Sequence, residues 1–115
     1  MTVRDPGALL RTGIRVLEAE ADAVRNLVGR VGDSFLSALD VAAACRGKII
    51  VTGLGKSGII CKKIAATLSS TGSPAIFLHA SDALHGDCGL MAKDDIVLAV
   101  SKSGETEEIL RLLNV

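Results

Sequence analysis

Hydrophobic residues in the first third of the chain recur in steps of three and four, as on one face of a helix. They are Leu10, Ile14, Leu17, Ala21, Val24, Val28 and Val31. Asp5 can cap such a helix and Pro6 suits its first position, so a long amphipathic helix is predicted to begin here. The stripe has the a/d spacing of a coiled coil, which fits ordinary packing within the domain or packing against another subunit.

A second helix is predicted from Asp33 or Ser34 to Gly47, after which the pattern changes to short apolar runs. Three of these runs are typical of buried strands, and helical segments separate them. The predicted strands are 48–52, 74–79 and 95–101, the predicted helices are 59–71 and 106–113, and a short capped helical turn with a loop covers 81–87. This alternation predicts an α/β fold, a doubly wound parallel sheet with right-handed crossovers.

The length of 115 residues allows one domain or part of one. Three parallel strands would make a small sheet. We therefore expect residues 1–47 to form N-terminal helices and residues 48–115 to form the first half of a larger domain. The remaining strands are then expected to be missing or to be replaced by a partner chain.

Composition excludes several classes of partner. Lys and Arg total 13, as do Asp and Glu, so the formal net charge is +0. The chain therefore has no net positive charge that would attract nucleic acid or anionic lipid. Aromatic residues make up 2% of the chain, too few for base stacking. Residues 64–81 lack charge, but Ser, Thr, Gly and Pro interrupt them, so no membrane span is expected. Three cysteines without CxxC spacing indicate reduced thiols in a cytosolic protein.

A glycine-rich segment, 53–58, follows the first predicted strand and precedes a helix. This placement presents free backbone N–H groups to an anion, typically a phosphate. The segment fits the dinucleotide pattern GxGxxG, but the second strand ends at His79, with Asp82 three residues later, instead of at an acidic residue. The Walker A pattern requires a glycine where Ile50 stands. Both nucleotide interpretations are therefore disfavoured.

A second turn rich in hydroxyl groups, 101–106, follows the third strand and opens another helix. Ser101, Ser103 and Thr106 either cap that helix or form a second site for an oxyanion. Ligands of open α/β sheets bind at the carboxyl ends of the strands, where both turns are expected to lie. Two neutral turns at this edge favour a small phosphate ester over a long dinucleotide.

The same residues resemble the sugar isomerase (SIS) family, whose phosphate loop follows the pattern S-x-S-G-x-T/S-x-E. The matching residues are Ser101, Ser103, Gly104, Thr106 and Glu108. Within that family the chain is most similar to the arabinose-5-phosphate isomerases, on the segments 53–58, 65–74, 78–79, 85–90 and 101–109. The resemblance is strong over residues 48–115, whereas the N-terminal helices match by position only.

This resemblance implies a flavodoxin-like fold, the SIS fold. It implies an aldose–ketose isomerase that interconverts ribulose 5-phosphate and arabinose 5-phosphate, on the route to Kdo, a sugar of lipopolysaccharide. No cofactor is then required. The expected state is a cytoplasmic homo-oligomer, a dimer or tetramer, whose sites draw on neighbouring subunits.

The resemblance also assigns roles to individual residues. It makes Glu108 the general acid or base, Lys56 the group that stabilises enediolate or phosphate charge, and His85 a further catalytic residue that contacts the substrate. The expected substrate and phosphate ligands are Ser57, Gly72, Ser73, His85, Ser101, Ser103, Gly104, Thr106 and Arg111. His79 corresponds to a position that can take an inhibitory or incidental zinc ion. From the residues alone, Glu108 also fits a solvated first helical turn, Lys56 a surface lysine, and the histidines loop packing.

Family members carry a further catalytic glutamate and a histidine beyond position 115, and most carry a pair of CBS domains. We therefore expect a truncated form that binds a phosphosugar weakly and is inactive or severely impaired alone. The alternative function is a non-catalytic phosphosugar-binding regulatory module. Lys56 and the HGD sequence at 85–87 favour the enzyme.

Overall fold

The structure is a computed structural model that describes residues 5–114. Its contacts divide the chain into two units, Met1–Ala38 and Leu39–Val115. The helix α2 (Asp33–Ala44) runs across this division. The second unit therefore takes in the end of α2.

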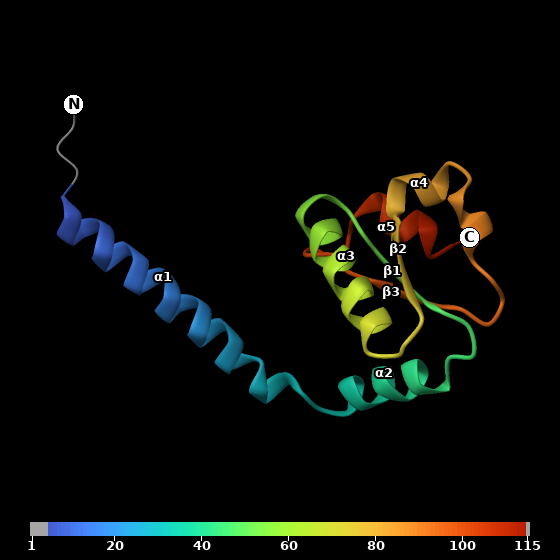
Figure 1. Ribbon diagram of the computed structural model, residues 1–115, viewed down its shortest axis with the longest axis horizontal. Helices are drawn as coiled ribbons and strands as arrows, with labels where there is room; N and C mark the ends of the chain where they lie inside the picture. Colours follow the sequence, from blue (N-terminus) through green and yellow to red (C-terminus); the bar gives the residue numbers. More distant parts are fainter. Residues whose placement is uncertain (1–4, 115) are drawn as a thin grey trace. The chain divides into compact units, whose positions relative to one another are not determined.

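The first unit consists mainly of the helix α1 (Pro6–Asn26), labelled in Figure 1. The predicted cap is confirmed, because the Gly7 N–H donates to Asp5 Oδ1 at 2.9 Å. No residue of Pro6–Asn26 is buried. Leu10 and Leu17 of the apolar stripe are 70% and 69% exposed.

The helix α1 ends earlier than predicted. Val28 lies in a 3-10 turn, Val28–Arg30, and Val31 adopts an extended conformation after it. Gly29 and Gly32 disfavour continued α-helix, since glycine loses more backbone entropy than other residues on becoming helical.

A three-stranded parallel sheet forms the centre of the second unit. Its strands are β1 (Ile49–Gly53), β2 (Ala75–His79) and β3 (Ile96–Ala99). The order is β2-β1-β3, with Ile49 of the central strand opposite Ala75 and Ile96. All five residues of β1 are buried, as expected for a strand covered on both faces. The predicted α/β class is confirmed.

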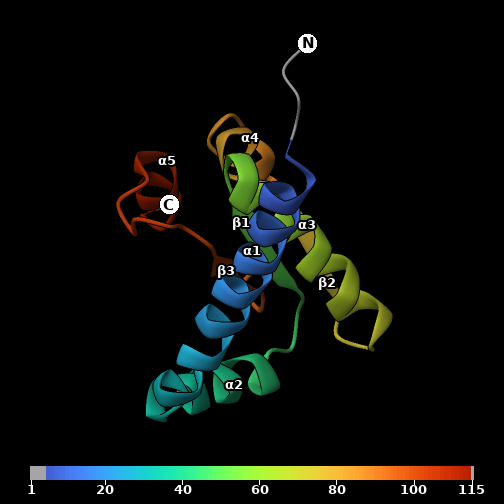
Figure 2. The same cartoon turned by 90° about the vertical axis from the view of Figure 1, so that its left-hand side faces the viewer.

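Helices cover both faces of the sheet, as Figure 2 shows. The helix α3 (Gly55–Ser70) packs on one face, while α4 (Ala80–Leu84) and α5 (Glu107–Leu112) pack on the other. Val51 contacts the cluster under α3, which contains Cys61, and Ile50 contacts the cluster under α4 and α5. Alternate side chains of β1 thus join both layers.

Two element boundaries differ from the prediction. The helix α3 begins at Gly55 rather than Ile59, so the glycine-rich segment supplies the first helical turn. The strand β3 ends at Ala99, so Ser101 lies in the loop after the strand. A 3-10 turn, Asp87–Leu90, follows α4.

The strand β3 is an edge strand. Within the described residues it pairs with β1 alone. Its central residues Val97 and Leu98 are 40% and 42% exposed, although they point to opposite faces of the sheet.

An ion pair joins the amino-terminal ends of β1 and β3. Lys48 donates to Asp95 twice, from its backbone N–H to Oδ1 at 2.8 Å and from Nζ to Oδ2 at 2.5 Å. The Ala92 N–H donates to Oδ2 at 2.7 Å. The Lys48 ammonium and the two backbone N–H groups lower the pKa of Asp95 to about 2.

No helix in the described part of the chain is both long and apolar enough to cross a membrane.

Candidate functional site

A cavity of about 480 Å³ opens at the carboxyl ends of β1 and β3. Its lining comes from the two turns that the sequence singles out: Leu54, Ser57, Val100, Ser101, Lys102, Ser103 and Thr106. The predicted convergence of both turns at one edge of the sheet is therefore confirmed. Open α/β sheets bind their ligands at this edge.

The first wall of the cavity is the junction of β1 with α3. Leu54 is the residue before the helix, and its side chain makes no capping hydrogen bond. The helix approaches the strand closely: a Cβ added at Gly58 would lie 3.0 Å from the Gly53 carbonyl oxygen. Glycine at both positions thus lets the first turn of α3 rest on the end of β1, which places the half-buried Ser57 in the cavity wall.

The second wall is the loop between β3 and α5. The Val100 N–H donates to the Thr52 carbonyl at 2.9 Å and extends the pairing with β1 past the end of the strand. Beyond it, Ser101 Oγ lies 2.8 Å from Thr106 Oγ1 and accepts from the Gly104 N–H at 3.1 Å. Gly104 has φ +73°, in the left-handed region that favours glycine. These bonds bend the loop so that its hydroxyl groups line the cavity.

Four of the predicted phosphate ligands line this cavity: Ser57, Ser101, Ser103 and Thr106. Sequence reasoning did not assign a role to Leu54, Val100 or Lys102, which line it too. The place of Lys102 in the lining could have been predicted, since it stands between two predicted ligands. No sequence feature indicated that Leu54 and Val100 line the cavity, because apolar residues beside a strand end are expected to pack in the core.

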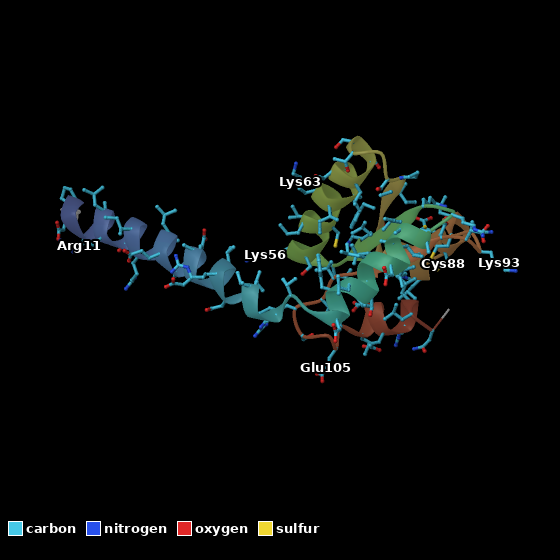
Figure 3. All side chains as sticks on the ribbon, turned by 90° about the horizontal axis from the view of Figure 1, so that it is seen from below. Arg11, Lys56, Lys63, Cys88, Lys93 and Glu105 are labelled. Atoms are coloured by element: carbon cyan, nitrogen blue, oxygen red, sulfur yellow. The ribbon has the colours of Figure 1, made fainter. Side chains whose placement is uncertain are left out.

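The predicted catalytic residues lie beside the cavity but are not part of its lining. Lys56 is exposed in the first turn of α3, next to Ser57, and Glu108 is exposed in the first turn of α5. Figure 3 shows Lys56 on α3 and Glu105 in the loop before α5. Each side chain thus flanks one of the two turns.

The two histidines follow β2. His79 is its last residue, lies opposite Gly53 and is half-buried, with Nδ1 buried and without a hydrogen-bond partner among the described residues. His85 is exposed just after α4. Because β2 is parallel to β1, both histidines lie toward the same edge of the sheet as the cavity, outside its lining.

Gly72 and Ser73 do not join this cavity. They precede β2, and the neighbouring Pro74 carbonyl accepts from the Ile49 N–H at 2.8 Å, at the amino-terminal end of the sheet. They line a different pocket at that end, with Gly47 among its other residues. Within this chain Gly72 and Ser73 therefore lie at the opposite edge of the sheet from Ser57, and their contact with the substrate stays a prediction.

Two further residues that were predicted to bind the substrate or its phosphate, Arg111 and Gly104, make hydrogen bonds within the chain instead. Arg111 pairs with Glu107 on the exposed surface of α5 and is absent from the cavity lining. The Gly104 N–H is already donated to Ser101 Oγ, so this group shapes the loop and is not free for a phosphate. Neither contact with a ligand is supported by the geometry of this chain.

Comparison with known proteins adds to this geometry. The model of the SIS domain matches residues 43–115, which include the sheet and both cavity turns. The chain belongs to the SIS domain family. The match covers the larger part of the chain and confirms the family resemblance carried by the two turns.

Curated relatives of this SIS chain are named as isomerases. It is 52% identical over 99 residues to arabinose 5-phosphate isomerase KdsD of Pseudomonas aeruginosa, covering 86% of this chain and 30% of that protein. It is 48% identical over 102 residues to arabinose 5-phosphate isomerase GutQ of Shigella flexneri, covering 89% and 32%. The SIS chain thus spans about a third of the length of these relatives.

A solved structure of similar fold holds a sugar phosphate. It is that of E. coli CFT073 c3406 in complex with arabinose 5-phosphate, with a TM-score of 0.91 and 40% identity, covering 96% of the SIS chain and 59% of that chain. At this identity, the arrangement of strands and turns is shared along almost all of the SIS chain.

Proposed function

We propose that this chain carries the phosphosugar site of an aldose–ketose isomerase that interconverts arabinose 5-phosphate and ribulose 5-phosphate. The observation that carries this proposal is the meeting of hydroxyl groups from two turns at one cavity, beside the start of α3. A phosphate dianion requires several donors in one place, and the amino-terminal end of a helix adds a favourable field.

The charge of the lining supports a phosphate over a cation. Among the described residues that line the cavity none is a carboxylate, and Lys102 supplies a positive charge. The relatives named arabinose 5-phosphate isomerase and the solved structure in complex with that sugar phosphate support a pentose phosphate as the ligand.

The reaction moves one proton between neighbouring carbons. In the aldose-to-ketose direction a base removes the proton from C2, an enediol forms, and the proton is delivered to C1 while a hydroxyl proton passes from O2 to O1. We assign the acid or base role to Glu108, charge stabilisation to Lys56 and a substrate contact to His85. Their positions beside the two turns, or after β2, support these assignments.

No cofactor enters this proposal, because the steps are proton transfers without net oxidation. The inhibitory zinc ion expected at His79 gains no support from this chain. Zinc sites in proteins usually combine three or four nitrogen, sulfur or oxygen ligands. The described residues contain no cluster of three or more His, Cys, Asp or Glu side chains that could hold a metal.

Binding of arabinose 5-phosphate to the 115-residue chain tests the site. Isothermal titration of the wild type should show binding that free arabinose neither reproduces nor competes with. Ser57→Ala should weaken the affinity by about 10-fold or more, because a loss of this size is typical when a hydrogen bond to a charged group is removed.

The matched control is Ser70→Ala, which removes a serine hydroxyl from the opposite end of α3. It should bind as the wild type does. Equal affinity for arabinose and its 5-phosphate, or an equal loss in both variants, would contradict the proposal. Supply of the product to the route to Kdo and a cytoplasmic location stay predictions.

We also propose that a second copy of the chain covers the apolar stripe of α1. The stripe repeats at coiled-coil spacing, and Leu17 is 69% exposed in the isolated chain. Burial of several such side chains would drive association.

Sedimentation equilibrium tests this second proposal. The wild type should form an oligomer that Leu17→Glu dissociates, since the new charge would be buried in the contact. The control Arg15→Glu changes a charge on the opposite side of the helix and should leave the oligomer intact. A wild type that stays monomeric at high concentration would overturn it.

A further inference from the structure

The edge of β3 that faces away from β1 presents hydrogen-bonding groups in a fixed pattern. The Ile96 and Val100 N–H groups donate at 3.1 and 2.9 Å to backbone carbonyls on the β1 side. Successive residues of a strand direct their backbone groups to alternate sides, so Val97 and Ala99 turn their N–H and C=O groups away from β1. Within the described residues no strand pairs with that side. Both residues therefore offer backbone donors and acceptors to a further strand.

The side chains of this edge are apolar at its centre and charged at its ends. Val97 and Leu98 are both exposed. Asp94 and Lys102 lie four residues before and four residues after Leu98. Both are exposed, and neither takes part in an ion pair among the described residues. Opposite charges thus stand at equal separations along the sequence from the centre of the edge.

We propose that a second copy of this chain pairs antiparallel with β3, about a two-fold axis at Leu98. In this register the N–H and C=O groups of Val97 bond to those of Ala99 in the second copy, and the reverse pair forms by symmetry. The outward groups of both residues are then satisfied. Asp94 of each copy lies at the same end as Lys102 of the other, so the charges attract at both ends. The two sheets become one continuous sheet.

The end charges and the hydrogen-bonding pattern select this arrangement over others. A parallel second copy would place Asp94 beside Asp94 and Lys102 beside Lys102, and like charges in opposite positions destabilise paired strands. A shift of the antiparallel register by one residue would oppose outward groups of one strand to groups of the other that already bond to β1. The two-fold pairing also closes the β3 edge of both copies.

Charge reversal at the ends of the edge tests the proposal in the Leu17→Glu background, which disrupts the α1 contact. Sedimentation equilibrium without ligand should show a dimer, because Leu17→Glu reduces a larger wild-type assembly to the β3-paired dimer. Asp94→Lys and Lys102→Asp should each weaken this dimer by about 10-fold or more, since two attractive pairs become repulsive. An equimolar mixture of the two variants should regain the lost affinity, because every end charge then meets its opposite.

Two further variants separate the edge from the rest of the surface. Lys63→Asp is the matched control, because Lys63 is exposed on α3, which packs on β1 and β2 (Figure 3), and it should leave the dimer unchanged. Val97→Pro removes an outward N–H, a change that edge strands tolerate, and should weaken the dimer. Urea unfolding of each variant shows that the chain remains folded.

A Leu17→Glu chain that stays monomeric at high concentration would overturn the proposal. So would a mixture of Asp94→Lys and Lys102→Asp that associates no more strongly than either variant alone, since the dimer would then use another register or another surface. Equal weakening by Lys63→Asp would likewise assign the effect to net charge and not to the β3 edge.

Discussion

Gly47 occupies a position where a side chain has no room. A Cβ added there would lie 2.3 Å from Asp95 Oδ1 and 2.7 Å from the Asp94 carbonyl oxygen. The Gly47 N–H also donates to that carbonyl at 3.0 Å. The residue therefore allows the chain to pass against the turn that precedes β3.

We predict that Gly47→Ala lowers the free energy of unfolding by about 1–3 kcal/mol, because the added methyl displaces backbone atoms. Urea denaturation measures the change. The control is Gly13→Ala in α1, where nothing lies within 4 Å of an added Cβ. There alanine should stabilise the helix by about 0.5–1 kcal/mol, and a similar gain at position 47 would contradict the packing argument.

Sequence patterns predicted residues that act locally and missed those that act through distant contacts. The hydroxyl groups of Ser57 and Ser103 were predicted because each lies in a turn at a strand end, and parallel strands bring such turns together. Gly47 was predicted only as a helix stop, since Asp94 and Asp95 lie far along the chain. The position of Gly72 at the amino-terminal edge of the sheet could not be predicted, because a motif match does not say at which edge a residue lies.

At the scale of elements, the ion pair of Lys48 and Asp95 ties the start of β1 to the start of β3. The Asp95 side chain is 4% exposed and accepts hydrogen bonds from Lys48 and Ala92. Its pKa falls from an ordinary value of 3.8 to about 2, so the folded state favours the ionised carboxylate.

A lowered pKa in the folded state fixes the direction of the pH dependence. The stabilisation from Asp95 is complete above about pH 4 and is lost as the pH falls from about 4 to about 2, where the carboxyl group becomes protonated in both states. We predict that Asp95→Asn unfolds at lower urea concentration than the wild type at neutral pH and that this difference shrinks across that window.

The control for this series is Asp40→Asn, an exposed residue of α2. Its unfolding midpoint should follow that of the wild type at every pH. A constant difference between Asp95→Asn and the wild type down to about pH 2 would show that the ion pair does not cause the loss in acid.

Element types were predicted better than element ends. Every predicted strand is present because a β-branched run between turns has few other packed conformations. The start of α3 was placed too late, since glycines that normally interrupt helices here allow the helix to contact β1. The end of α1 was placed too late, because its apolar spacing continues past the glycines that end it.

At the scale of the whole molecule, stability is unevenly distributed along the chain. The strand β1 is buried throughout and pairs on both sides, whereas no residue of α1 is buried. Amide groups open to solvent more readily where few apolar contacts must be broken.

We predict that amide hydrogen exchange is slowest in β1 and fast throughout α1 in dilute solution. Mass spectrometry of peptides from the two regions measures both rates. If α1 associates with a second copy, its protection should increase with protein concentration while that of β1 stays the same. Slow exchange of α1 at low concentration would contradict its exposure in the monomer.

The unpaired edge of β3 in the described structure favours aggregation when this chain is expressed. In the part of the chain that the structure describes, the backbone groups beside Val97 and Leu98 have no strand partner on one side, and they form a template on which an unrelated extended segment can add, the first step toward inclusion bodies. Charged side chains stand at both ends of this short run, Lys93 and Asp94 before it and Lys102 after it. Flanking charges of this kind limit such growth, so we predict that neutralising Lys93 and Asp94, which lie outside the cavity lining, lowers soluble yield without altering ligand affinity.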